Sequence, residues 1–158
     1  MSDGLQAKVD FSTWLGGLAA LGGPIKISLA RSMGVAGGMV IRDQAKEFAP
    51  VRDGTLRAAI YLAYREAYSD ERTVTYSISW NAKKAPHGHL IEFGHWQTNY
   101  LYKDEDGDWK AGHPLAHPKW IAAHPFLRPA LEGSALAYHA MIERGRERLP
   151  ELLAEFAR

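Results

Sequence analysis

The sequence predicts an α+β fold: a long N-terminal helix and a C-terminal helix packed on a small antiparallel sheet, with an extended hairpin or loop insertion. Apolar residues recur at helical spacing in residues 25–48 and again after residue 125. Between these stretches the pattern alternates every second residue, most clearly in TVTYSISW (73–80), as in a strand with one buried face. A chain of 158 residues suits one domain.

The N-terminal part is expected to be helical in two pieces. Residues 1–23 form a helical arm around FSTWLGGLAAL (11–21), and residues 24–48 form one long helix with Pro24 in its first turn. Gly34 and Gly38 leave a groove on this helix where another helix or a sheet can approach closely. The expected apolar stripe follows Leu29, Met33, Ala36 and Val40, then shifts to Ile41, Ala45 and Phe48.

Residues 55–112 are expected to hold the antiparallel strands and the hairpin. The segment APVRDGT (49–55) ends the helix in a turn, because the residue before proline leaves the helical region. Strands at 56–65 and 73–80 then pair through YSDER, with the Ser and Thr face solvated or hydrogen-bonded. Residues 81–123 are expected to be irregular apart from a hairpin at 100–110, whose turn is Asp106-Gly107. The turn motif consists of Pro50, Asp53, Gly54, Thr55 and Leu56.

HPFLRPAL (124–131) opens the C-terminal helix, expected over 124–157. Pro125 and Pro129 lie near the first turn, where a missing N–H costs little, and they stiffen the entry. Phe126 and Leu127 are expected to anchor that turn on the sheet, so that the helix leaves at one fixed angle. Pro150 is expected to kink or restart the helix.

Composition excludes several functions. Lys and Arg (19) nearly balance Asp and Glu (18), so the basic excess of a strong nucleic-acid binder is missing. Without cysteine there is no disulfide, thiol nucleophile or cysteine zinc cluster. The N-terminus has no secretion-signal pattern, and the most apolar window, SMGVAGGMVI (32–41), is half of the ~20 residues that a bilayer requires. We expect no membrane partner.

Seven histidines raise the alternative of a small metal-dependent hydrolase or nuclease. His113 and His117 have the i, i+4 spacing of a helical zinc pair, but each precedes a proline, which disfavours a helix there. His87 and His89 complete the candidate cluster. Phosphate-binding loops, dinucleotide fingerprints and nucleophile elbows are missing from the sequence. We therefore expect a protein that is not an enzyme and needs no cofactor.

Five aromatic residues fall in or beside the irregular segment, where a small sheet has little room for them. One interpretation is a local core beneath a long loop. The other is a protein–protein contact, because interfaces favour large, rigid Trp and Tyr side chains. The five are Trp96, Tyr100, Tyr102, Trp109 and Trp120.

Three stretches in order, AKEFAPVRDGTLRAAI (45–60), HLIEFGH (89–95) and HPFLRPAL (124–131), resemble a phage family. This is the lambdoid tail-component family, with gene-product-ten-like neck, tail-completion and head–tail joining proteins of long-tailed phages. The resemblance covers about residues 25–140. The sequence departs from the family pattern in the order Arg52-Asp53-Gly54-Thr55, in His95 where threonine is common, and in an enlarged hairpin at 96–112.

The resemblance implies a structural virion protein, made in the host cytoplasm and placed at the head–tail junction as a tail-completion, tail-terminator or neck-ring subunit. The expected partners are copies of itself in a ring, hexameric by analogy with tail-tube symmetry, and neighbouring neck, head-closure and tail-tube proteins. Contact with the DNA passing through would be transient at most. Glu92 is expected to pair with an arginine such as Arg128. The expected interface residues are Trp96, Tyr100, Tyr102 and Trp109, supported by Glu92, Phe93 and Gly94.

Overall fold

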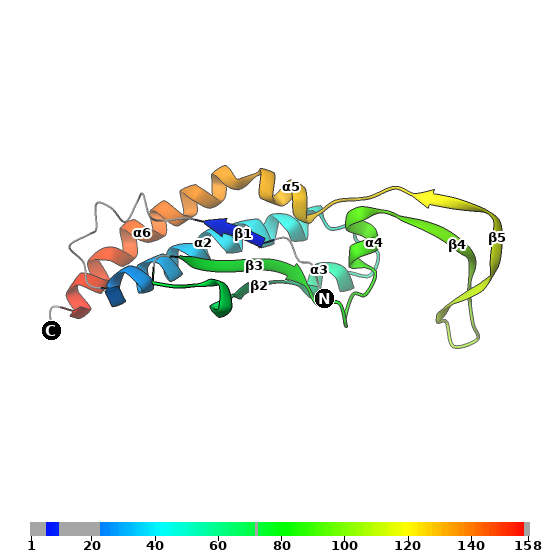
Figure 1. The fold of residues 1–158 in the computed structure, drawn as a ribbon, viewed down its shortest axis with the longest axis horizontal. Coiled ribbons are helices and arrows are strands. Elements are labelled where there is room, and N and C mark those ends of the chain that lie inside the picture. Colours follow the sequence, from blue (N-terminus) through cyan, green and yellow to red (C-terminus); the bar gives the residue numbers. More distant parts are fainter. Residues whose placement is uncertain (1–5, 10–22, 72, 157–158) are drawn as a thin grey trace.

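The computed structural model describes residues 6–9, 23–71 and 73–156. Two long helices lie side by side along an elongated body, a small sheet lies against them, and a β-hairpin projects from one end (Figure 1). The predicted α+β class is confirmed. None of the described helices combines the length and apolar character that a membrane crossing requires.

The two long helices are α2 (Gly23–Phe48) and α6 (Ser134–Phe156), which run in opposite directions. The predicted long helix is therefore confirmed, but its buried stripe is simpler than expected. It does not shift at residue 40; it continues through Gly37, while Phe48 is exposed. Gly37 is buried in this stripe, but glycine has no apolar side chain, so the spacing of apolar residues did not predict its burial. The stripe consists of Ile25, Leu29, Met33, Gly37, Ile41 and Ala45.

The glycines of α2 allow close packing on two sides. A Cβ added at Gly34 would lie 2.7 Å from the Tyr76 ring, and one at Gly38 would lie 2.6 Å from Leu62. Both neighbours belong to the sheet, so the predicted groove exists and receives sheet side chains. Gly37 faces α6 instead, where a Cβ would lie 2.5 Å from Met141.

The three-stranded sheet has the order β1-β3-β2, from Gln6–Val9, Val74–Trp80 and Ile60–Tyr64, and both pairings are antiparallel. In the register, Leu62 faces Ile78 and Lys8 faces Thr75. The prediction of a helical arm over residues 1–23 is wrong at residues 6–9, where β1 extends the sheet because β3 offers an edge to pair with. The helix expected at 11–21 lies outside the described residues.

The first predicted strand begins later than expected. Residues 55–59 form the short helix α3 (Thr55–Ala59), and the chain becomes extended only at Ile60. The 3₁₀ helix η2 (Glu66–Tyr68) follows β2 and helps to cover the Ser and Thr face of β3. That face is buried and hydrogen-bonded: Thr75 donates to the Tyr68 carbonyl at 2.6 Å, and Arg65 Nε donates to Ser77 Oγ at 2.5 Å.

Residues 81–123 are more regular than predicted. They contain α4 (Gly88–Phe93) and a long hairpin of β4 (His95–Lys103) and β5 (Trp109–Ile121), so the hairpin expected at 100–110 extends well beyond both limits. The strands of this hairpin follow no clean alternation because both faces are largely solvent-exposed. Alternation signals a strand only when one face is buried.

The C-terminal helix begins later than predicted and in two pieces, α5 (Leu127–Glu132) and α6, separated at Gly133. The expected anchoring of Phe126 and Leu127 is confirmed, since both are buried and the Phe126 ring meets the Trp80 ring edge-on at 5.9 Å. Pro150 was expected to kink or restart the helix; a restart is wrong, because α6 continues through Pro150, and the kink stays a prediction. Arg-Glu pairs at i, i+3 cover the exposed face of α6, as in Arg144–Glu147.

Candidate interaction surface

Glu92 joins two motifs that are more than thirty residues apart in sequence. Its side chain is fully buried, and its carboxylate accepts hydrogen bonds from the backbone N–H groups of Phe126 at 2.8 Å and Leu127 at 3.0 Å. Arg128 adds its backbone N–H at 3.3 Å and its Nε at 3.2 Å, and its Nη2 donates to the Glu92 carbonyl at 2.8 Å. The expected pairing of Glu92 with Arg128 is confirmed.

The Glu92 carboxylate performs the function of an N-cap for α5 from another part of the chain. The first N–H groups of a helix have no partner within it, and a carboxylate there also interacts favourably with the helix dipole. Phe126, next to the helix start, makes no side-chain cap of its own. The packing of HPFLRPAL therefore depends on HLIEFGH.

The two ends of the hairpin are held together at its base. The His124 N–H donates to the Ile91 carbonyl at 2.8 Å, and Trp96 meets Trp120 edge-on at 5.5 Å across the strands. Gly94 turns the chain from α4 into β4 with φ 74° and ψ 171°, a conformation essentially restricted to glycine. These contacts give the base of the hairpin one fixed geometry.

The hairpin exposes large side chains along its whole length. Trp96 is 61% exposed and Trp109 is 53% exposed, and β4 and β5 pack almost entirely on each other. A two-stranded hairpin alone is marginally stable in water, and large exposed apolar surfaces mark interaction sites. Of the two interpretations of these aromatics, the structure contradicts the local core. The exposed large residues of the hairpin are Trp96, Tyr100, Leu101, Tyr102, Trp109 and Trp120.

A few contacts order the outer half of the hairpin. The Tyr100 and His113 rings stack at 5.5 Å, and Lys103 lies 5.4 Å from the centre of the Trp109 ring. Arg52, from the turn after α2, also contacts Trp109, with its guanidinium carbon 6.0 Å from the ring centre. This cation–π contact links the outer hairpin to the body.

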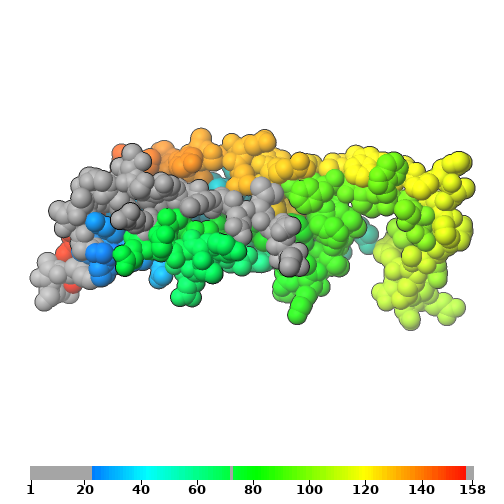
Figure 2. Space-filling model, viewed as in Figure 1, coloured from blue at the N-terminus to red at the C-terminus, as the bar shows by residue number. Residues whose placement is uncertain are grey.

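A groove of about 590 Å³ lies between the hairpin and the body. Figure 2 shows the surface hollowed between the body and the projecting hairpin. Leu101 and Trp109 line the hairpin side, whereas Leu90 and Ile91 line the body side. The segment after α2 lines another part of the wall, and His87 and His95 also line the groove. The residues of that segment are Pro50, Val51, Arg52, Asp53, Gly54 and Leu56.

The turn motif is organised by Asp53. Its Oδ1 accepts the Thr55 N–H at 2.9 Å, next to Gly54, which has a positive φ of 81°. Pro50 is exposed, Thr55 begins α3, and Leu56 is buried in the core. The motif therefore sets the direction of the chain between α2 and the sheet.

We expect Asp53 to titrate below the ordinary range of an aspartate. Hydrogen bonds from the backbone and side chain of Thr55, helped by the charge of Arg52, lower the pKa of the Asp53 carboxyl. Because the folded-state pKa is the lower one, the stabilising contribution is present above the unfolded-state pKa of about 4 and is lost as pH falls through the folded-state value. Carbon-detected NMR titration would measure this pKa, with urea-unfolded protein as the control. Equal values in the two states would contradict the prediction.

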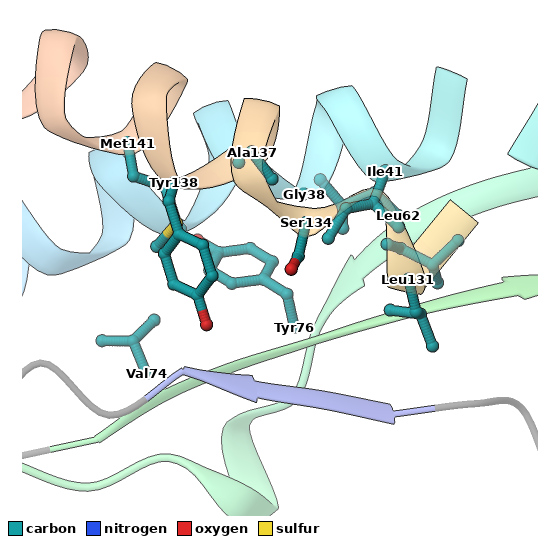
Figure 3. Close-up of a pocket in the computed structure, with 13 residues that line it drawn as sticks. Gly38, Ile41, Leu62, Val74, Tyr76, Leu131, Ser134, Ala137, Tyr138 and Met141 are labelled. Carbon is teal, nitrogen blue, oxygen red and sulfur yellow. The ribbon is translucent and has the colours of Figure 1, made fainter. Parts of the chain in front are cut away.

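A second cavity, of about 210 Å³, lies between the helices and the sheet (Figure 3). Tyr138 and Met141 of α6 approach it from the helical layer, and Val74 and Tyr76 of β3 from the sheet. Burial raises the pKa of the Tyr76 hydroxyl. The lining is mostly apolar, with the Tyr76, Tyr138 and Ser134 hydroxyls as its polar side-chain groups, so the cavity offers room for an apolar group.

The structure does not gather the histidines of the metal alternative. His113 and His117 lie on the exposed strand β5, where the i, i+4 relation of a helix is lost, while His87 and His89 lie at the start of α4. Among the residues that the structure describes, no group of three or more His, Cys, Asp or Glu side chains could hold a metal ion.

The predicted interface residues divide into two sets. Trp96, Tyr100, Tyr102 and Trp109 lie together on the hairpin, and Glu92, Phe93 and Gly94 lie at its base. Phe93 is exposed, with Arg128 above its ring at 5.5 Å. Sequence reasoning missed Arg52, whose contact with Trp109 comes from a turn more than fifty residues away and has no local signal.

Residues 21–94 match the family model described as "Bacteriophage HK97-gp10, putative tail-component". No curated protein and no solved structure matches the chain significantly. The match contains the turn motif and HLIEFG and ends at Gly94, before the hairpin and HPFLRPAL.

Over residues 21–94 the chain is therefore similar to bacteriophage tail components. The resemblance drawn from the sequence motifs is thereby confirmed over α2, the turn, β2, β3 and α4, whereas β1 and HPFLRPAL lie outside the match. A tail component is a part of the virion, and such families are typically structural.

Proposed function

We propose that this protein is a structural subunit of the head–tail junction, which completes the tail and joins it to the head through protein–protein contacts. Copies of the chain form a ring, hexameric by analogy with tail-tube symmetry. The faces of the ring contact neck or head-closure proteins on one side and tail-tube proteins on the other. DNA passing through the ring makes at most transient contact with it, in keeping with a net charge of +1.

The observation that carries the proposal is the aromatic hairpin on its fixed base. The matched segment supplies α2, α3, β2, β3 and α4 of the body and ends at Gly94, where the hairpin begins. The body sets the angle of the hairpin through Glu92 and Gly94, and the hairpin presents aromatic side chains that the chain itself leaves uncovered. Fixed geometry matters in a ring because angular errors between subunits prevent closure.

The experiment is complementation of a gene deletion in the phage or prophage that encodes the protein. Without the gene, we expect filled heads and finished tails that remain separate under electron microscopy. A variant with Trp96→Ser and Trp109→Ser is expected to fail in the same way. Interface anchors of this kind contribute about 2 kcal/mol each, so losing two weakens docking on the order of a thousandfold.

Tyr68→Ser is the matched control. Tyr68 is as exposed as Trp96 but lies on η2, away from the hairpin. It should restore a normal titre of infectious particles. Infectious virions at normal titre from the deletion itself would contradict the joining role, and normal titre from the Trp96→Ser, Trp109→Ser variant would contradict the role of the hairpin.

A further inference from the structure

We propose that the tip of the hairpin of one copy binds a basic corner of a second copy of the same chain, and that this contact repeats around the ring. The tip is defined as residues 104–108. The basic corner is defined as Arg57, Lys83 and Lys84. The inference rests on the proposed function, because it names the partner of the hairpin within the ring.

The tip presents three carboxylates that have no partner among the described residues. Asp104 is used within the chain: its Oδ1 accepts the Asp108 N–H at 2.8 Å, and its Oδ2 pairs with Lys110 at 3.3 Å. The tip is thereby held in one shape. The exposed carboxylates of Glu105, Asp106 and Asp108 remain.

The basic corner presents three cations and no acid. Segments 54–59 and 81–87 contain no Asp or Glu, and all three basic side chains are exposed without an ion pair in the described part of the chain. The Asn81 N–H donates to the Ala59 carbonyl at 3.0 Å, which places the two segments next to each other. Asn81 Oδ1 also accepts the backbone N–H of Lys83 at 2.9 Å, so the lysine loop is ordered.

Three unpaired carboxylates therefore match three unpaired cations. Within one chain no ion pair joins the tip to the basic corner among the described residues, and Arg52 holds Trp109 near the turn motif. Charge complementarity of this kind selects partners and fixes their register. Because the two surfaces differ, the contact is head-to-tail, the kind that closes identical subunits into a ring.

The hairpin explains why the contact is needed. Its aromatic side chains are uncovered and its strands pack on each other rather than on the body. A neighbour held at the tip would cover the outer hairpin, including Tyr102 and Trp109 beside the tip.

Cysteine cross-linking tests the proposal without background from native cysteines of this chain, because it contains none. The double variant Asp106→Cys, Lys83→Cys is introduced into the phage, and assembled particles are oxidised and run on non-reducing gels. We expect a ladder of multimers that ends at the closed ring and so counts its subunits. The matched control is Lys119→Cys with Lys83→Cys, which uses the same hairpin near its base and should give no ladder.

Charge reversal provides a second readout that does not depend on disulfide geometry. Glu105→Lys with Asp106→Lys should lower multimer formation by at least about tenfold, and so should Lys83→Glu with Lys84→Glu. The four changes combined should restore it, because the attraction is reversed on both sides. Absence of rescue would contradict the pairing.

The remaining outcomes separate this proposal from the joining role. Particles that carry the double-cysteine variant without a ladder, or with Asp106→Cys linked to another virion protein, would overturn the contact between copies while leaving the joining role intact. An intramolecular link that yields only monomer would also overturn it. The joining role fails only through the gene deletion described above.

Discussion

Glu92→Ala is expected to destabilise the protein by about 3–5 kcal/mol. The substitution leaves the buried N–H groups of Phe126 and Leu127 without an acceptor and Arg128 without its carboxylate. Unsatisfied buried donors cost about 1–3 kcal/mol each, and the loss of the pair with the half-exposed Arg128 adds at most about 1 kcal/mol. Urea unfolding followed by circular dichroism would measure the loss.

Two controls separate the contributions at this site. Arg128→Ala should lower the free energy of unfolding by less, about 1–2 kcal/mol. The Arg128 side chain is 47% exposed, and the backbone N–H groups still donate hydrogen bonds to the Glu92 carboxylate. Glu105→Ala, at the exposed tip, should change the free energy of unfolding by less than about 0.5 kcal/mol. If Glu92→Ala were as mild as Glu105→Ala, the carboxylate would not hold the two motifs together.

Gly94→Ala is expected to destabilise the protein by about 3 kcal/mol and to displace the hairpin. Its φ and ψ lie in a region essentially open to glycine alone, where strain costs about 1–3 kcal/mol. Steric conflict adds to this strain, since the new Cβ would lie 2.8 Å from the Ile121 carbonyl oxygen and 2.8 Å from Trp120. Denaturant unfolding would give the energy, and the tryptophan fluorescence of the native protein should shift as Trp120 moves.

Gly107→Ala is the matched control for this effect. Gly107 also has a positive φ, 83°, but a Cβ there would meet no atom within 4 Å. Only conformational strain remains, about 1 kcal/mol. Equal losses at the two positions would show that contact with Ile121 and Trp120 contributes nothing at Gly94.

Glu92→Ala and Gly94→Ala both act at the base of the hairpin, where the body ends and the proposed interaction surface begins. The two substitutions differ in which part of the structure they disturb. Glu92→Ala weakens the start of α5 and with it the packing of Phe126 on Trp80, whereas Gly94→Ala disturbs the angle between α4 and β4. A joining defect from a stable, mispositioned hairpin would therefore show more clearly in the glycine variant.

The sequence predicted the elements whose burial is one-sided and periodic. The long helix, the strand at 73–80 and the anchoring role of Phe126 and Leu127 were all readable, because each buries a regular set of apolar side chains. The hairpin was recognised only at its turn. Its strands have two exposed faces and therefore lack the alternation that marks a strand.

Contacts between distant segments were harder to foresee. Strand β1 exists because β3 offers it an edge, and nothing in QAKV by itself excludes a helix. Residues 55–59 form a helix where a strand was predicted, and Ser77 is buried. Both features depend on residues that are distant in sequence, which local patterns do not reveal.

By itself the sequence determined the α+β class, the family resemblance and the aromatic composition of the hairpin, because these depend on residue type and short-range spacing. Only the tertiary structure decided that Glu92 caps α5, that the aromatics stand uncovered on a projecting hairpin, and that an acidic tip and a basic corner are both left unpaired. These features arise where chain segments far apart in sequence meet or fail to meet. The periodicity of apolar residues along the chain carries no information about contacts between distant segments.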